Sequence, residues 1–221
     1  MSKKIEIKGG LRNDPLSFNV IKSKGNHEYY QGNKRVYDHE LQRVTSKYRL
    51  SIDEIDHAIE SLTQTLPNVH FIQRTSFIHD RVRFLGCTLW IHADPQLAYK
   101  MNDFDHIADF TPDKCDEFND RDIKWLNSQL DLPNDGTYDS TVVMSHHLPS
   151  YQLIAEKYHG NPMNGFYANN LDSLVMKANI WVCGHTHYAK HVMIGNCRCY
   201  VNPTGYAGEV SNYDPNAIIE I

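Results

Sequence analysis

The sequence lacks several features that would place it in a specialised class of protein. No apolar run approaches the length of about 18 residues that a bilayer-spanning helix needs, and Met1–Lys8 contains no apolar core of a secretory signal. No block of basic residues is present, and 22 Lys and Arg against 27 Asp and Glu give a net charge of −5. Such a balance disfavours general nucleic-acid binding. We therefore expect a cytoplasmic chain that does not enter a membrane.

The cysteines show no metal-binding or disulfide pattern. There are five, at positions 87, 115, 183, 197 and 199, and none forms a C-x-x-C pair. An odd number without a secretory signal indicates reduced thiols in a cytosolic setting. Cys197 and Cys199 are two apart in a strand-like run and could share a metal ion, but packing as small apolar side chains is the favoured interpretation.

The 221 residues, 41% of them hydrophobic, suit one domain over residues 1–221. Short apolar runs alternate with helical patterns, which favours an α/β fold. The strands are predicted at Phe18–Lys24, Val69–Gln73, Val82–Ile91, Thr141–Ser145, Asn179–Cys183, Arg198–Val201 and Ala217–Ile221.

Three helices are predicted from their start and stop signals. Ser51-Ile52-Asp53-Glu54 has the form of a capping box, and apolar residues then recur at helical spacing until Pro67. Thr111-Pro112 is a good N-cap followed by proline at the first helical position, and the pattern extends to Leu130. A shorter helix fits Leu171–Ala178.

Histidine is abundant, with 13 residues, and five of them stand in turns that directly follow predicted strands. These turns are Gly25-Asn26-His27-Glu28, Ser145-His146-His147 and Gly184-His185-Thr186-His187. Side chains beyond the carboxyl ends of strands gather in one crevice of an α/β sheet. We therefore expect the three turns to meet. Of the other histidines, His159 is the one most expected to line a pocket, and the rest are interpreted as surface or packing residues.

Imidazole nitrogens and an asparagine carbonyl oxygen together favour Mn, Fe, Zn or a similar divalent ion over Ca. Two such ions about 3.5–4 Å apart form the clamp used in phosphate-ester hydrolysis. Each turn alone is a weak signal, because Gly-Asn is a common turn pair and a histidine can be satisfied by a backbone carbonyl. The three turns together favour a metal site.

With these motifs the sequence resembles the calcineurin-like metallophosphoesterases, particularly their small bacterial and viral-type members. The likeness runs from about Asn19 to the C-terminus. It also includes Arg83–Trp90, Phe110-Thr111-Pro112, Asn202–Tyr206 and Gly208-Glu209. It implies two packed β-sheets flanked by helices, in a four-layer α/β/β/α sandwich with a dinuclear metal site at one sheet edge.

The resemblance also implies the role of each site residue. A metal-bound hydroxide would attack the phosphorus of a phosphate ester, and His27 would assist the leaving group, oriented by Glu28. Asn26, His146 and His185 would ligate the second metal, and His187 the first. His147 is expected to be structural or to stand behind the ligands. A weaker expectation is that His147, Tyr29, Asn202 and Tyr206 contact substrate.

The sequence departs from the family pattern ahead of Gly25. The pattern begins with D-x-H and G-D-x-x motifs on two earlier strands, and the 24 residues before Gly25 contain neither. The expectation is a fold without its N-terminal strand or strands, without two ligands of the first metal, and without the aspartate that bridges both ions.

Three interpretations of that departure stay open. The first is an active phosphoesterase whose upstream segment was lost from the gene model or is supplied by another chain. The second is a catalytically inactive scaffold that binds a protein partner, and the third is a mononuclear metal protein with weak or altered hydrolysis. The expected substrates are phosphate-ester small molecules or phosphoproteins. A partner strand or a second copy of the chain could cover the exposed sheet edge.

Overall fold

The computed structural model describes residues 4–6, 20–31, 35–38, 43–46, 49–206, 209 and 212–221, with the backbone alone for 4–6, 35–38 and 43–46. Residues 18 and 19 of the predicted strand Phe18–Lys24 therefore lie outside the described residues, as do His39 and Gly208.

A six-stranded sheet forms the centre of the molecule, in the order β10-β11-β9-β8-β7-β6. Its strands are β6 (Thr75–His79), β7 (Val82–Gly86), β8 (Ser140–Met144), β9 (Ile180–Cys183), β10 (Lys190–Ile194) and β11 (Cys197–Val201). Strands β7, β8, β9 and β11 run parallel, while β6 and β10 pair antiparallel at the two edges. The carboxyl ends of the four parallel strands consequently meet along one side of the sheet.

Three further strand pairs lie outside this sheet. Strand β2 (Val20–Lys22) lies parallel to β5 (Val69–Phe71), and β1 (Lys4–Glu6) lies antiparallel to β12 (Ile218–Glu220). Strands β3 (Arg35–Asp38) and β4 (Arg43–Ser46) form an antiparallel pair of their own.

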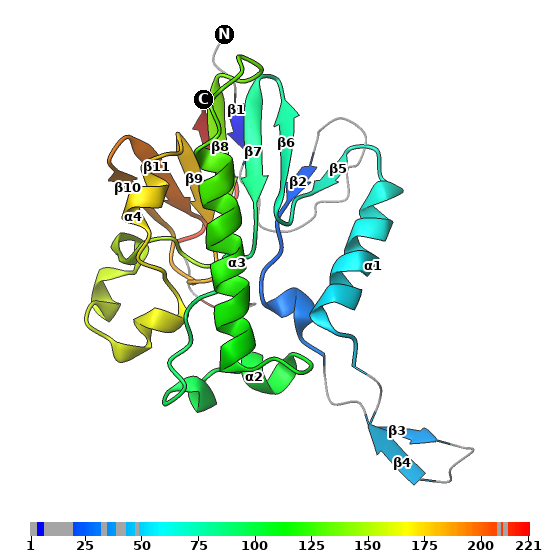
Figure 1. The fold of residues 1–221 in the computed structure, drawn as a ribbon. Helices are drawn as coiled ribbons and strands as arrows, with labels where there is room; N and C mark the ends of the chain where they lie inside the picture. The colour runs from blue at the N-terminus through cyan, green and yellow to red at the C-terminus, as the bar shows by residue number, and fades with distance from the viewer. Residues whose placement is uncertain are drawn as a thin grey trace.

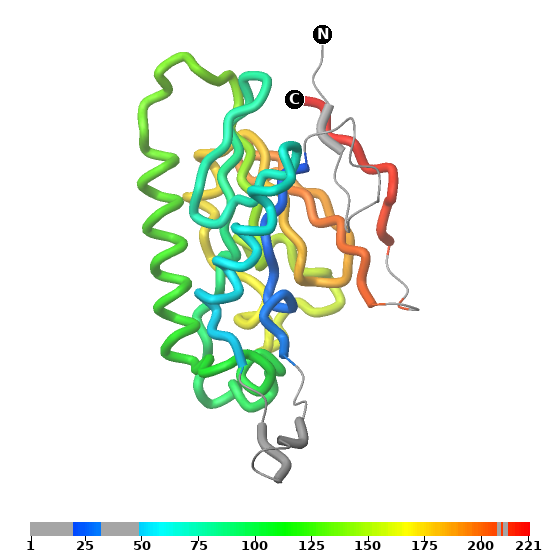
Figure 2. Tube along the Cα trace, turned by 90° about the vertical axis from the view of Figure 1, so that its right-hand side faces the viewer, coloured from blue at the N-terminus to red at the C-terminus, as the bar shows by residue number. Residues whose placement is uncertain are grey.

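Helices flank these sheets, as expected of the α/β fold class. Helix α3 (Pro112–Leu130) runs along one face of the central sheet, and the C-terminal segment with β12 lies on the opposite face (Figures 1 and 2). Helix α1 (Ile52–Gln64) packs beside β5. Single turns complete the set: α2 (Asp103–His106), α4 (Asp172–Val175), η1 (His27–Tyr29), η2 (Ala98–Lys100), η3 (Tyr151–Leu153), η4 (Glu156–Tyr158) and η5 (Pro162–Phe166). Within the described ranges no helix is long and apolar enough to cross a membrane.

Both faces of the central sheet are buried. In β8, Val143 belongs to the core under α3, whereas its neighbour Val142 packs in a second core with Ile219 of β12. Burial on both faces explains why the parallel strands appear in the sequence as continuous apolar runs. Cys197 and Cys199 are fully buried in the first of these cores, as the packing interpretation expects.

The longer predicted helices are confirmed. Helix α1 begins after Ser51, whose side chain accepts from the Glu54 N–H while the Glu54 carboxylate accepts from the Ser51 N–H. The N-cap of α3 is Thr111, as predicted. The predicted helix Leu171–Ala178 is shorter, because only Asp172–Val175 is helical.

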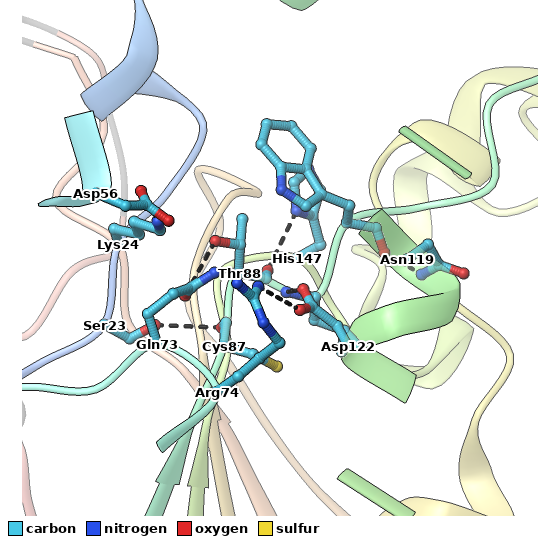
Figure 3. Close-up of polar contacts among 12 residues, drawn as sticks. Ser23, Lys24, Asp56, Gln73, Arg74, Cys87, Thr88, Asn119, Asp122 and His147 are labelled. Atoms are coloured by element: carbon cyan, nitrogen blue, oxygen red, sulfur yellow. Dashed lines mark hydrogen bonds and ion pairs between the residues drawn. The ribbon is translucent and has the colours of Figure 1, made fainter. Parts of the chain in front are cut away.

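The predicted strand Val82–Ile91 is wrong beyond Gly86, where β7 ends. The Cys87 N–H still donates to Met144 of β8 at 3.1 Å. Beyond it, side chains of α3 satisfy backbone groups: the Leu89 N–H donates to Asp122 at 2.8 Å, and Asn119 donates to the Trp90 carbonyl. Figure 3 shows Asp122 and Asn119 projecting from α3 toward this segment. Edge strands β6 and β10 were not predicted, since half their residues are exposed and break the apolar run.

Candidate metal centre and active-site cavity

The three histidine turns meet, as predicted, at the carboxyl ends of the parallel strands. Together with the turn that contains Asn202, they line a cavity of about 1060 Å³. Backbone hydrogen bonds hold the turns in register. The Thr88 carbonyl, just beyond β7, accepts from the N–H groups of both His146 and His147 at 3.2 Å, and the His146 carbonyl accepts from Gly184 at 3.0 Å.

Three donor atoms from three different turns converge in this cavity. The Asn26 Oδ1 atom lies 2.8 Å from His146 Nε2, which in turn lies 3.1 Å from His185 Nδ1. Each of these atoms can direct a lone pair into the same small space. Two ligand atoms about 2.1 Å from a common ion and at right angles to each other are about 3 Å apart, so the spacing suits one divalent ion.

The close approach of these groups requires a glycine at position 25. A Cβ atom on Gly25 would come within 2.5 Å of the His146 ring, nearer than atoms pack. The backbone at His185 is also unusual, with a φ of 63°, in the left-handed region that a histidine rarely adopts. Such backbone strain is often found at functional sites, where the surrounding structure maintains it.

Three buried histidines, His146, His147 and His185, are electrically neutral near neutral pH. Burial is the main cause that lowers the pKa of His146 and His147 well below the ordinary value, and neighbouring histidines act in the same direction. Burial likewise lowers the pKa of His185 to about 3, although the backbone of Phe166 opposes the shift. Neutral imidazole is the form that ligates a metal.

Two residues that the sequence did not single out stand behind Asn26. Its Nδ2 donates to Asp103 Oδ1 at 2.7 Å, and the Tyr30 hydroxyl donates to the same oxygen at 2.6 Å. Asp103 is buried, on the single turn α2. It follows no apolar strand and belongs to no motif, so no sequence signal marked it.

His27 and His187 occupy the mouth of the cavity, where Tyr206 connects them. His27 is exposed, its Nε2 lies 3.2 Å from the Tyr206 hydroxyl, and its ring stacks on Tyr30 at 4.3 Å. The His187 ring meets Tyr206 edge-on at 4.7 Å, and its Nδ1 lies 2.7 Å from Glu209 Oε2. His187 therefore lines the cavity with one nitrogen already paired.

Glu28 has a different place from the predicted one. Its carboxylate folds back over the turn, accepts from the Gly25 N–H at 2.8 Å and lies 3.5 Å from Lys22 Nζ. The ring of His27 instead contacts Tyr30 and Tyr206. The expectation that Glu28 orients His27 is therefore corrected: Glu28 stabilises the turn that carries Asn26.

The residues expected to contact substrate divide into two groups. Tyr206 and Asn202 line the cavity, although the Asn202 amide is already hydrogen-bonded to the backbone of Asp214. Tyr29 and His147 are 0% and 1% exposed and lie outside the cavity lining, so their predicted contact with substrate is corrected to core packing. His159 is also absent from the lining.

Two ion pairs, each with one fully buried partner, connect neighbouring segments of the fold (Figure 3). Lys24, just before the first turn, pairs with Asp56 of α1, and the Tyr29 hydroxyl donates to the same carboxylate at 2.8 Å. Arg74 pairs with the fully buried Asp122 at 3.1 Å. Burial raises the pKa of the Asp122 carboxyl, and Arg74 opposes that shift.

The charges that line the cavity favour an anionic ligand. Four lysines line it, at positions 22, 24, 100 and 157, against two glutamates. Lys24 adds little to the charge, because it is paired with Asp56 and burial lowers its pKa to about 7. Both glutamates are engaged, Glu28 with Lys22 and Glu209 with His187. This local excess of positive charge stands in a chain whose net charge is −5. A cleft lined mainly by one sign of charge concentrates ligands of the opposite sign.

The donor set fits one divalent metal ion. Two neutral imidazoles and an amide oxygen suit Mn, Fe or Zn. Across the described residues, no group of three or more His, Cys, Asp or Glu side chains is arranged to hold a metal. A metal ion held here would therefore depend on the Asn26 amide in addition to His146 and His185.

Comparisons with known proteins confirm the fold. No family model matches the sequence. Uncharacterized protein L509 of Acanthamoeba polyphaga mimivirus is 25% identical over 227 residues, which cover 94% of this chain and 75% of that protein. Among solved structures, phosphopantetheinyl hydrolase of Mycobacterium tuberculosis matches with a TM-score of 0.59 and 13% identity, over 85% of this chain and 70% of that one. The chain has the metallophosphoesterase-like α/β fold of that hydrolase.

Proposed function

We propose that this chain is a metal-dependent phosphoesterase related to the calcineurin-like family. The observation that carries the proposal is the convergence of three donor atoms. Asn26 Oδ1 lies 2.8 Å from His146 Nε2, which lies 3.1 Å from His185 Nδ1. Their cavity is also lined by an excess of lysines. Imidazole and amide donors beside an anion-attracting surface are what a metal-assisted reaction of a phosphate ester requires.

A divalent ion held by these donors would polarise a phosphoryl oxygen and make water more acidic. The chain's own residues supply the rest. His27, at the cavity mouth, donates a proton to the oxygen of the departing alcohol. The Tyr206 hydroxyl at 3.2 Å holds the ring of His27 in position for that transfer.

The lysines recruit the substrate and orient its phosphate. Lys22, Lys100 and Lys157 lie on the lining from three separate segments. A phosphate group alone is small beside a cavity of about 1060 Å³, so the remaining volume accommodates the alcohol part of the ester. Small phosphate esters and a phosphorylated side chain of a protein both meet these requirements.

A catalytically inactive scaffold is the alternative function. The observation that favours it is the absence of a carboxylate among the three converging donor atoms in the described part of the chain. Carboxylates offset the charge of a metal ion and bridge paired ions, so a site without one holds metal less strongly.

Metal content and hydrolysis distinguish the two functions. The purified chain is loaded with Mn²⁺, Zn²⁺ or Fe²⁺, its bound metal is measured by mass spectrometry, and hydrolysis of p-nitrophenyl phosphate is followed. We expect about one ion per chain and turnover that His185→Ala abolishes. His57→Ala is the matched control, because His57 is an exposed histidine on α1. It should leave the metal content and the turnover unchanged.

A chain that binds no metal and shows no turnover would overturn the proposal and leave the scaffold. Two ions per chain with turnover would support hydrolysis and require further ligands beyond the three donors. Turnover that survives His185→Ala would also contradict the proposed site.

A further inference from the structure

Asn26 can serve a metal ion with only one end of its side-chain amide. The carbonyl oxygen has lone pairs to offer, whereas the NH₂ group has two hydrogens and would repel a cation. The two ends have nearly the same shape, so the amide can turn over with little steric cost, and its hydrogen-bond partners decide which end faces the cavity.

Asp103 determines which end of the Asn26 amide faces the cavity. An ionised carboxylate accepts hydrogen bonds and cannot donate them, so the Asp103 oxygen 2.7 Å from the amide takes the NH₂ end. The opposite end of the amide, Oδ1, is thereby directed to His146, 2.8 Å away. Asp103 is 5% exposed, so water does not readily replace it as the acceptor.

Tyr30 holds Asp103 in turn. Its hydroxyl donates to the same Oδ1 atom at 2.6 Å. Burial raises the pKa of the Tyr30 hydroxyl, and the hydrogen bond to Asp103 acts in the same direction, so Tyr30 stays protonated and remains a donor. The carboxylate is consequently fixed between two donors and has little freedom to turn away from Asn26.

We infer that Asp103 is a positioning residue of the metal centre, which acts by fixing the Asn26 amide with its oxygen toward His146. The inference rests on the proposed function for its effect on metal binding. It extends that function to a residue 77 positions away from Asn26 in the sequence. Partners that orient metal ligands in this way typically change metal affinity by about 10- to 100-fold when they are removed.

The test is Asp103→Leu, which keeps about the size of the side chain and removes both acceptor oxygens, so that the Asn26 amide is free to turn over. Mn²⁺ and Zn²⁺ affinities are measured by calorimetry on folded protein, and we expect a loss of about 10- to 100-fold. Asp105→Asn is the matched control, because it removes one negative charge from the same helical turn at an exposed position. Asp105→Asn should change the metal affinity less than about twofold, because solvent and salt screen the charge of an exposed carboxylate.

A second readout needs no metal, so it separates failure of this inference from failure of the proposed function. In metal-free protein, nitrogen NMR reports whether His146 carries its proton on Nε2, where it donates to Asn26 Oδ1. The side-chain amide protons of Asn26 report their hydrogen bond to Asp103. Both signals should change in Asp103→Leu and stay as in the native protein in Asp105→Asn.

Unchanged NMR signals in a folded Asp103→Leu variant would overturn the inference, whatever the metal result. If that variant does not fold, Tyr30→Phe decides, because it removes one of the two donors that hold Asp103 without changing charge. A smaller loss of affinity together with a shifted Asn26 amide signal would support the inference. Native values of both would contradict it.

Discussion

The imidazole of His146 lies directly against the backbone of Gly25, so close that any Cβ at residue 25 would come within 2.5 Å of the ring. The turn that carries Asn26 and the turn that carries His146 therefore touch through a glycine, which brings Asn26 Oδ1 to 2.8 Å from His146 Nε2. Packing at residue 25 and the geometry of the donor atoms are coupled.

The first prediction is that Gly25→Ala separates the donor atoms. The added methyl group displaces the His146 ring, and a shift of about 1 Å in a reacting centre can lower kcat/KM about 100-fold. Gly165→Ala is the matched control, because the nearest atom to a Cβ there is the Tyr151 hydroxyl at 3.8 Å, an ordinary contact. Metal affinity and p-nitrophenyl phosphate hydrolysis are the measurements. Full affinity and activity in Gly25→Ala would show that the ring can move without consequence.

The second prediction concerns the ion pair between Lys24 and Asp56. Asp56→Asn leaves Lys24 buried without its carboxylate, so we expect the free energy of unfolding to fall by about 3 kcal/mol. This is the lower end of the range for a broken buried pair, because burial already lowers the pKa of Lys24 to about 7 and lets it lose its proton. Asp139→Asn breaks the exposed pair with Arg81, where both side chains are more than half exposed, and should cost less than about 1 kcal/mol. Urea denaturation measures both.

A second variant of that experiment removes the unpaired charge of Lys24. Lys24→Met combined with Asp56→Asn should recover part of the lost stability, since an unpaired buried charge costs more than an apolar side chain of similar size. Equal losses in Asp56→Asn and Asp139→Asn would instead mean that Lys24 reaches water once its partner is gone.

The sequence was sufficient to predict the turns of the site because each depends on local information. An apolar strand followed by glycine and histidine is visible in about eight consecutive residues, and parallel strands place their carboxyl ends together by topology. The capping box of α1 and the N-cap of α3 are equally local. These features could therefore be predicted without knowledge of the tertiary fold.

Partners from distant segments could not be predicted in the same way. His27 contacts Tyr206, 179 residues along the chain, instead of its near neighbour Glu28. Asp103 reaches Asn26 from a turn without periodicity. Beyond the end of β7 at Gly86, the Leu89 N–H donates to Asp122, a residue of α3 that lies 33 positions further along the chain. Each outcome depends on which segment packs nearby, which only the fold determines.

The third prediction is that the metal-free protein loses stability as the pH falls below about 6.5. Burial lowers the pKa of His147 well below its ordinary value, so below about pH 6.5 the unfolded chain takes up a proton that the native state does not. The free energy of unfolding therefore has its full value above the pKa of His147 in the unfolded chain, and it decreases as the pH falls below that pKa. His147 alone should contribute about 1 kcal/mol between pH 6.5 and 5.5, with His146 and His185 acting in the same direction.

Denaturation in the presence of a chelator, at pH steps from about 7.5 to 5.5, measures this slope. His147→Asn removes one of the titrating groups, so its curve should be flatter by about one proton. A native curve that is flat over this range would mean that the histidines are hydrated and titrate as they do in the unfolded chain.

The last prediction tests His27 as the proton donor to the leaving group. p-Nitrophenolate departs readily without a proton, whereas an alkoxide does not. His27→Ala should therefore lower kcat for an alkyl phosphate by about 100-fold or more and for p-nitrophenyl phosphate by much less. Tyr206→Phe removes the hydroxyl 3.2 Å from His27 Nε2 and should show the same preference at smaller size. Equal losses on both substrates would assign His27 to phosphate binding instead, because a contact with the phosphoryl group affects all esters alike.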